Sequence, residues 1–158
     1  MKTKILSIAT VLFIAITISS CTKKQGCIDS AATNYDANAE EDNGSCTYDA
    51  GAAIWWNQDF ADAADSASVT KVEVNIDGVL LQGMNIQDGV YASAPPCSQS
   101  GVILVSRQIT SDGKTVSASV TAYDANDNQI GTSVTWDINL QTQLLCNSYQ
   151  LDESEFQW

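Results

Sequence analysis

Apolar and polar residues alternate along three stretches of this chain. Residues 71–76, 115–122 and 134–140 each place an apolar side chain at every second position, with polar side chains between them. A period of two sends one set of side chains into a core and the other into water, which predicts a strand in each stretch. The pair Asp77-Gly78 is a hairpin turn signal and predicts a returning strand over 79–86.

Shorter apolar segments predict the remaining strands, over 54–56, 102–109 and 144–151. Residues 57–68 are polar and rich in alanine, and predict a loop or one helical turn with Phe60 pointing inward. About seven strands separated by turn signals are typical of an all-β domain. Two facing sheets bury such one-sided strands economically, so we expect a small two-sheet β-sandwich over residues 49–158.

The N-terminus has the pattern of an export signal. Lys2 and Lys4 precede an uncharged, mainly apolar run over residues 5–18. About 14 residues suit the apolar segment of a signal peptide and fall short of the ~20 that a spanning helix needs. The run ends in Ile18-Ser19-Ser20-Cys21, which resembles the lipobox of bacterial lipoproteins.

The lipobox resemblance implies cleavage before Cys21 and lipidation of that cysteine. Residues 1–20 would then be the signal peptide and residues 21–26 a lipidated tether to the membrane. We therefore expect a lipid-anchored protein of the bacterial cell envelope. Thr22 after the cysteine favours the outer membrane by the enterobacterial sorting rule, while the periplasmic or surface face stays open. An ordinary secretory signal and an uncleaved anchor are the alternatives.

Five cysteines are an odd number for an exported chain, and lipidation of Cys21 removes one from the count. The remaining four allow three pairings, and an oxidising compartment favours disulfides among them. Proximity along the chain favours Cys27–Cys46 and Cys97–Cys146, which would close loops of about 20 and about 50 residues.

Residues 27–48 have too few apolar side chains for a core of their own, so the cysteines at the two ends predict a disulfide-stapled mini-module. The segment resembles a short cysteine-bounded repeat of secreted and surface proteins of some bacteria. That resemblance implies an exported, stalk-like or linking module. It is carried by Gly26-Cys27, Asp29, Ala32, Asn34-Tyr35, Ala39, Asp42-Asn43-Gly44-Ser45-Cys46 and Tyr48.

Oxygen-bearing side chains in the mini-module suggest a calcium site, since calcium takes six to eight oxygen ligands. An EF-hand loop is excluded, because Glu41 and Thr47 stand where it needs glycine and a bidentate glutamate. The alternative is that these side chains form Asx-turns and caps. The calcium candidates are Asp29, Asn34, Asp36, Asn38 and Asp42, with a second, less favoured set at Asp124, Asn126 and Asn128.

Composition narrows the function. The formal charge is −12, and becomes −14 once Lys2 and Lys4 leave with the signal peptide. A surface of this sign repels nucleic acid, so no nucleic-acid partner is expected. Histidine is absent, which removes the commonest general base and most zinc sites. We therefore expect no enzyme and no cofactor apart from the calcium candidate.

Aromatic and acidic residues supply the remaining candidates. Adjacent Trp55 and Trp56 point to opposite faces of an extended chain, so we expect one in the core and the other exposed or covered by a loop. An exposed tryptophan could stack on a sugar or dock an envelope protein. Asp59, Asp62 and Asp65 recur every three residues, and would serve a carboxylate-dependent hydrolase as the enzymatic alternative.

Residues 72–78 resemble the opening hairpin of small transthyretin-like sandwiches, and that resemblance implies the fold alone. Taken together, the sequence predicts a lipid-anchored exported lipoprotein that displays a non-catalytic binding or structural sandwich. Carbohydrate or protein recognition through an exposed tryptophan and acidic loops is the alternative within the binding class.

Overall fold

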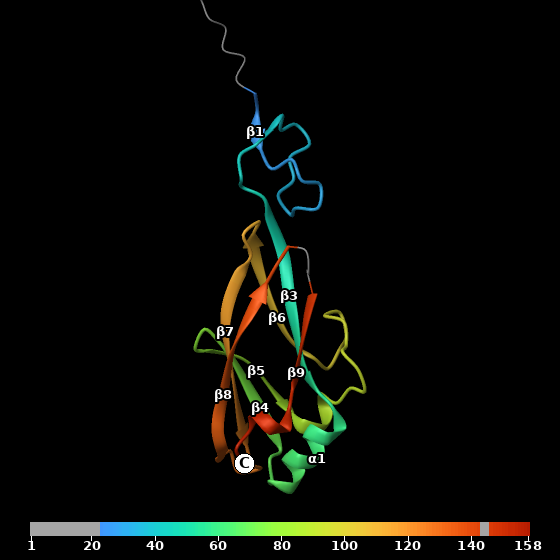
Figure 1. Ribbon diagram of the computed structural model, residues 1–158, viewed down its shortest axis with the longest axis vertical. Coiled ribbons are helices and arrows are strands. Elements are labelled where there is room, and N and C mark those ends of the chain that lie inside the picture. Colours follow the sequence, from blue (N-terminus) through green and yellow to red (C-terminus); the bar gives the residue numbers. More distant parts are fainter. Residues whose placement is uncertain (1–22, 143–145) are drawn as a thin grey trace, which may run out of the picture.

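The computed structural model describes residues 23–142 and 146–158. The molecule is elongated, with the chain entering at one end through a small loop-rich module and a two-sheet domain forming the rest (Figure 1). Helix α1 and the C-terminus lie at the end opposite the module. The fold is an all-β sandwich preceded by a disulfide-stapled module, as the alternating pattern predicts.

The first sheet has three strands in the order β6-β3-β9. Its central strand β3, Thr47–Trp56, is antiparallel to β6, Ile103–Thr110, and parallel to β9, Cys146–Leu151. The first and last long strands of the chain therefore lie side by side. A pairing between segments so far apart in sequence closes the domain on itself.

The second sheet has four antiparallel strands in the order β5-β4-β7-β8. The hairpin between β4 and β5 turns at Asp77-Gly78, whose φ angles of 52° and 79° are both positive. This is the geometry that an Asp-Gly pair favours, and it confirms the predicted turn. The strands are β4 Lys71–Ile76, β5 Val79–Asn85, β7 Lys114–Tyr123 and β8 Gln129–Leu140.

The core lies between the two sheets. Val72, Val74 and Ile76 of β4 are fully buried, while the polar residues between them face outward. Strand β7 repeats the arrangement, so the alternation seen in the sequence is the alternation of the sandwich. Its inward side chains are Val116, Ala118, Val120 and Ala122.

Residues 58–66 form helix α1, Gln58–Ser66, and not the expected loop or single turn. Asn57 caps it, because its side-chain oxygen accepts a hydrogen bond from the backbone N–H of Phe60 at 3.0 Å. Phe60 is fully buried, as predicted. No helix in the described part of the chain is long and apolar enough to cross a membrane.

The C-terminal tail packs against this helix. Two short helical turns, η1 Ile86–Asp88 and η2 Glu153–Glu155, flank the same region. The ring of Phe156 meets Phe60 edge-on with centroids 5.2 Å apart, and Trp158 stacks on Phe156 at 4.7 Å. These aromatic contacts fix the end of the chain to the sandwich.

Candidate functional site

The predicted lipidation site, Cys21, lies outside the described residues, and so does the signal peptide over 1–20. The described chain begins at Lys23, four residues before the first cysteine of the mini-module. Lys24 is already part of the module, because its ammonium lies 2.7 Å from Asp36 Oδ2.

Both predicted disulfides are confirmed. Cys27 and Cys46 join the two ends of the mini-module, with Cα atoms 4.9 Å apart. Cys97 and Cys146 join a loop to the start of β9, with Cα atoms 5.7 Å apart. The first pair is also the centre of the module, since Cys27 and Cys46 are among its few buried residues.

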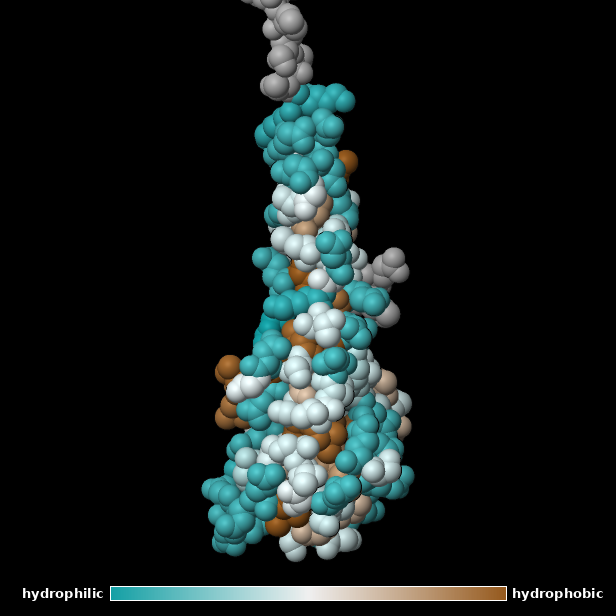
Figure 2. All heavy atoms as spheres, turned by 60° about the vertical axis from the view of Figure 1, so that its left-hand side comes forward, coloured by the Kyte–Doolittle hydropathy of each residue, from teal (hydrophilic) through white to brown (hydrophobic). Residues whose placement is uncertain are grey.

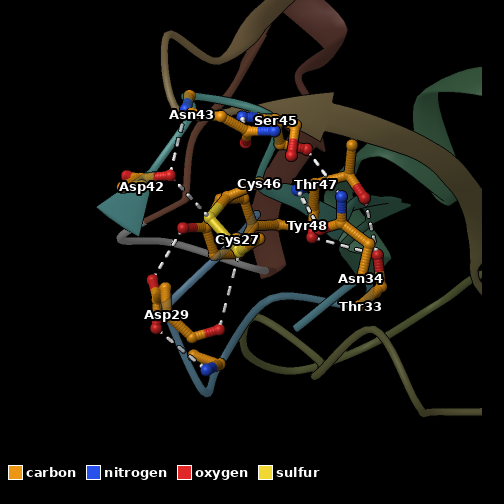
Figure 3. Close-up of a disulfide and its surroundings, with 12 residues drawn as sticks. Cys27, Asp29, Thr33, Asn34, Asp42, Asn43, Ser45, Cys46, Thr47 and Tyr48 are labelled. Atoms are coloured by element: carbon orange, nitrogen blue, oxygen red, sulfur yellow. Dashed lines mark hydrogen bonds between the residues drawn. A yellow bond between two sulfur atoms is a disulfide. The ribbon is translucent and has the colours of Figure 1, made fainter. Parts of the chain in front are cut away.

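The calcium candidates of the mini-module form hydrogen bonds within their own chain, and Figure 3 shows this for Asp29, Asn34 and Asp42. Asp29 accepts from the Tyr48 hydroxyl at 2.6 Å and from the backbone N–H of Ala31 at 2.9 Å. The bond from Tyr48 is the main reason that the pKa of Asp29 is lowered, and the same contact raises the pKa of Tyr48. The carboxylate therefore joins the first loop of the module to the start of β3.

Asp36 and Asn34 are engaged in the same way. Asp36 binds Lys24 and accepts from the backbone N–H of Asn38 at 2.9 Å, and these two contacts lower its pKa. Asn34 donates to the carbonyl of Ser45 at 2.6 Å and accepts from the N–H of Thr47 at 2.9 Å. The side chain of Asn34 thus makes the backbone hydrogen bonds that a neighbouring strand would otherwise make with the chain entering β3.

The remaining candidate carboxylate, Asp42, accepts from the N–H of Gly44 at 3.0 Å, which is an Asx-turn. Within residues 23–142 and 146–158, no group of three His, Cys, Asp or Glu side chains gathers as metal ligands would. Asp124 likewise accepts from the side-chain amide of Asn128 and from the backbone N–H groups of Asn128 and Asn126 in the β7–β8 turn, and these bonds lower its pKa. The geometry favours the turn-and-cap interpretation at both sets of residues.

The mini-module is joined to the sandwich without a linker. Strand β3 begins at Thr47, directly after Cys46, so the boundary expected between residues 48 and 49 falls inside a strand. Thr33 donates its backbone N–H to the carbonyl of Thr47 at 2.7 Å, and Gln108 of β6 reaches the Thr33 hydroxyl at 3.4 Å. The module is therefore bonded to two strands of the first sheet.

Trp55 and Trp56 are both buried, so of the two outcomes expected for the tryptophan outside the core, exposed or covered, the structure has the covered one. Trp56 lies in the core and donates its indole N–H to the carbonyl of Ile86 at 2.7 Å. Trp55 points to the outer face of the sheet, yet only 5% of it is exposed, and it donates to the Ser148 hydroxyl at 2.7 Å. Neither ring offers a free face to a sugar.

A loop held by the second disulfide covers part of that outer face. Cys97 lies in the segment between β5 and β6, and its backbone N–H donates to Cys146 Sγ at 2.9 Å. Gly51 of β3 lies beneath it, because a Cβ there would stand 3.6 Å from Cys97 Sγ. The predicted Cys97–Cys146 disulfide ties this loop to β9, whereas its approach to Gly51 depends on residues far apart in the chain.

The aspartates of α1 are helix-surface groups. Asp62 accepts from the side chain of Gln58 at 2.8 Å, one turn earlier, and Asp59 lies in the first turn, where a carboxylate stabilises the helix. Local contacts of this kind account for the positions of Asp59 and Asp62 on the helix surface.

The β5 edge of the second sheet is the most accessible apolar feature among the described residues of the sandwich. Val79 and Leu80 of edge strand β5 are 70% and 55% exposed. A shallow hollow of about 390 Å³ lies beside the same strand, lined by Lys71, Glu73, Gly83, Asn85 and Asp88 among others. In Figure 2 the module end is almost entirely hydrophilic, whereas apolar side chains reach the surface along the sandwich.

Comparisons with family models, with curated proteins and with solved structures found no match to this chain.

Proposed function

We propose that this chain is a lipid-anchored, exported lipoprotein of the bacterial envelope that displays a non-catalytic binding sandwich on a stiff stalk. The observation that carries the proposal is the continuity of β3. One strand leaves the stapled module at Thr47 and ends at Trp56 beside α1, so no flexible joint separates module from sandwich. Ten residues at about 3.3 Å each extend about 33 Å.

The arrangement of the two ends supports this role. The module, which contains the first described residues, stands at one end of the molecule, and the sandwich extends away from it (Figure 1). A lipid on Cys21 would thus hold the module near the membrane and present the sandwich at a distance. Acyl chains contribute about 0.8 kcal/mol per buried CH₂, so two or more of them give a stable anchor.

A binding role is favoured over catalysis by the side chains available. The chain has no histidine, and the carboxylates described above serve as caps and turn acceptors. We propose an envelope protein, with a surface glycan as the alternative, as the partner.

The anchor is tested by metabolic labelling with palmitate, followed by membrane fractionation. We expect label on the wild-type protein, and loss of both label and membrane retention for Cys21→Ala. Both proteins should keep the two disulfides and the same circular dichroism spectrum. A wild-type chain that carries no label, or a Cys21→Ala chain that stays labelled, would refute lipid anchoring.

A further inference from the structure

Strand β5 is a sheet edge without the usual protection. All seven residues, Val79–Asn85, are uncharged, and none is proline. Edge strands of soluble proteins commonly carry lysine, proline or a covering loop, because an open edge pairs with other chains. In the described residues no strand lies on the free side of β5.

The backbone register shows which groups point to this edge. Ile86 donates its N–H to the carbonyl of Thr70 at 3.0 Å, so the backbone N–H of Ile86 is directed toward the β4 side. Hydrogen-bonded and non-bonded pairs alternate in an antiparallel ladder. Gly83 and its partner Glu73 then form a non-bonded pair, and so do Asn85 and its partner Lys71. The backbone N–H and C=O groups of Gly83 and Asn85 are therefore directed away from β4. They are free to pair with an added strand.

Side chains beside the β5 edge would favour particular residues in an added strand. The register between β4 and β5 shifts at a β-bulge next to Val74 and Asn75 of β4. As a result, Leu80 and Gly83 both lie on the outer face of the sheet, two strand positions apart. Gly83 has no side chain, which leaves the hollow lined by Glu73 and Asp88 open above it. An added strand would place one side chain beside Leu80 and another over this hollow.

The hollow carries a net negative charge. Lys71 lies 2.6 Å from Asp127 and 3.3 Å from Glu73, so its charge is already neutralised, and Asp88 adds a further carboxylate. A basic side chain is the complement of this site. A second copy of β5 offers no cation, and would bring two such acidic hollows together.

We propose that β5 is a docking edge for an extended segment of a partner protein, which adds a fifth strand to the second sheet. The segment carries an apolar residue and, two positions away, a lysine or arginine. The apolar residue packs on Leu80, and the basic residue enters the hollow at Gly83. Main-chain hydrogen bonds supply affinity in this mode of recognition, and the alternate side chains supply specificity.

The test uses three synthetic peptides of alternating valine and threonine, identical except for lysine, threonine or glutamate at one central outward position. Binding to the detergent-solubilised mature protein is measured by titration calorimetry, with amide chemical shifts to locate it. We expect the lysine peptide to bind at or below about 1 mM, to shift amides of β5, and to bind more tightly than the glutamate peptide.

Two variants separate edge pairing from unspecific apolar contact. Gly83→Pro removes an outward donor while leaving the β4 ladder intact, and should weaken binding at least about fivefold, as expected for a lost hydrogen bond. Gly83→Ala keeps the donor and adds one methyl group, whose Cβ would stand an ordinary 3.5 Å from Glu73 Cγ, so it should weaken binding less than Gly83→Pro does. If Gly83→Pro does not fold, Glu73→Gln should weaken the lysine peptide and spare the threonine peptide.

Three results would overturn the inference: no binding at about 1 mM, equal affinity for the lysine and glutamate peptides, or a β5-dependent dimer in sedimentation experiments. The proposed docking edge rests on the proposed display function, since it names the class of partner that would be bound. The peptide assay itself does not depend on whether Cys21 carries a lipid. Failure of palmitate labelling refutes anchoring alone, and failure of peptide binding refutes the docking edge alone.

Discussion

Removing the Cys27–Cys46 disulfide should unfold the mini-module and leave the sandwich intact. Apart from the two cysteines, the buried apolar side chains of the module are Ala32 and, where it meets β3, Tyr48. The crosslink closes a loop with a sequence separation of 19, which in the chain-entropy model contributes about 3 kcal/mol. So few buried groups cannot replace that contribution, because each fully buried large apolar side chain contributes only about 1.5–3 kcal/mol.

The assay is native-state hydrogen exchange on the double variant Cys27→Ser/Cys46→Ser. The N–H groups of Thr33 and Thr47, which donate to the Thr47 carbonyl and to Asn34 Oδ1, report on the module. A loss of about 3 kcal/mol corresponds to roughly 150-fold faster exchange at these amides. Amides of Val72 and Val120 in the sandwich should keep their protection.

The matched control is Cys97→Ser/Cys146→Ser. This pair closes a loop with a separation of 49, worth about 4 kcal/mol, and it lies in the sandwich. The control should lower the melting temperature of the sandwich by roughly 15–30 °C and leave the exchange of Thr33 unchanged. If the first variant destabilises the sandwich as much as the second, module and sandwich unfold as one unit and the reasoning is refuted.

Three further predictions concern single sites. Gly89→Ala should destabilise the sandwich by about 1–3 kcal/mol in urea unfolding, because its Cβ would stand 2.4 Å from the Trp56 ring, and an unchanged midpoint would contradict that contact. The hydrogen bond from the Tyr48 hydroxyl holds the pKa of Asp29 below that of an ordinary aspartate, so the module should lose stability as pH falls below about 4. Tyr48→Phe should weaken this pH dependence in carboxylate titrations followed by NMR. Calcium at about 1 mM should leave the amide shifts of residues 27–48 unchanged, because their carboxylates act in turns, and saturable shifts at Asp29 and Asp36 would restore the calcium hypothesis.

Alternating apolar residues, turn residues and the spacing of cysteines predicted those parts of the fold that depend on residues close in sequence. The alternation over 71–76 and 115–122 marks two strands of the second sheet, and Asp77-Gly78 marks the turn that its positive φ angles require. The disulfide pairs followed from proximity, since Cys27 and Cys46 bound one short segment. These features depend on residues that are close in sequence.

The features that sequence reasoning missed depend on distant contacts. Helix α1 buries Phe60, Ala61 and Ala64, which gives too short an apolar stripe to stand out among aspartates. Strand β3 continues through Asp49-Ala50-Gly51, which resembles a junction, because Thr47 to Ile54 pair with β6 more than 40 residues later. Nothing near Trp55 in the sequence indicates that Ser148 of β9 will bind its indole.

The burial of Trp55 also moves the expected binding surface from one sheet to the other. Part of the outer face of β3 is covered by the loop that Cys97 ties to Cys146, and this loop passes close to Gly51. A partner on that side would have to displace a crosslinked segment. The edge at Val79 and Leu80 needs no such displacement, because its apolar side chains and the backbone groups of Gly83 already face solvent. Because the Cys97–Cys146 disulfide holds a loop against the first sheet, the β5 edge of the second sheet is the more accessible place for the proposed recognition.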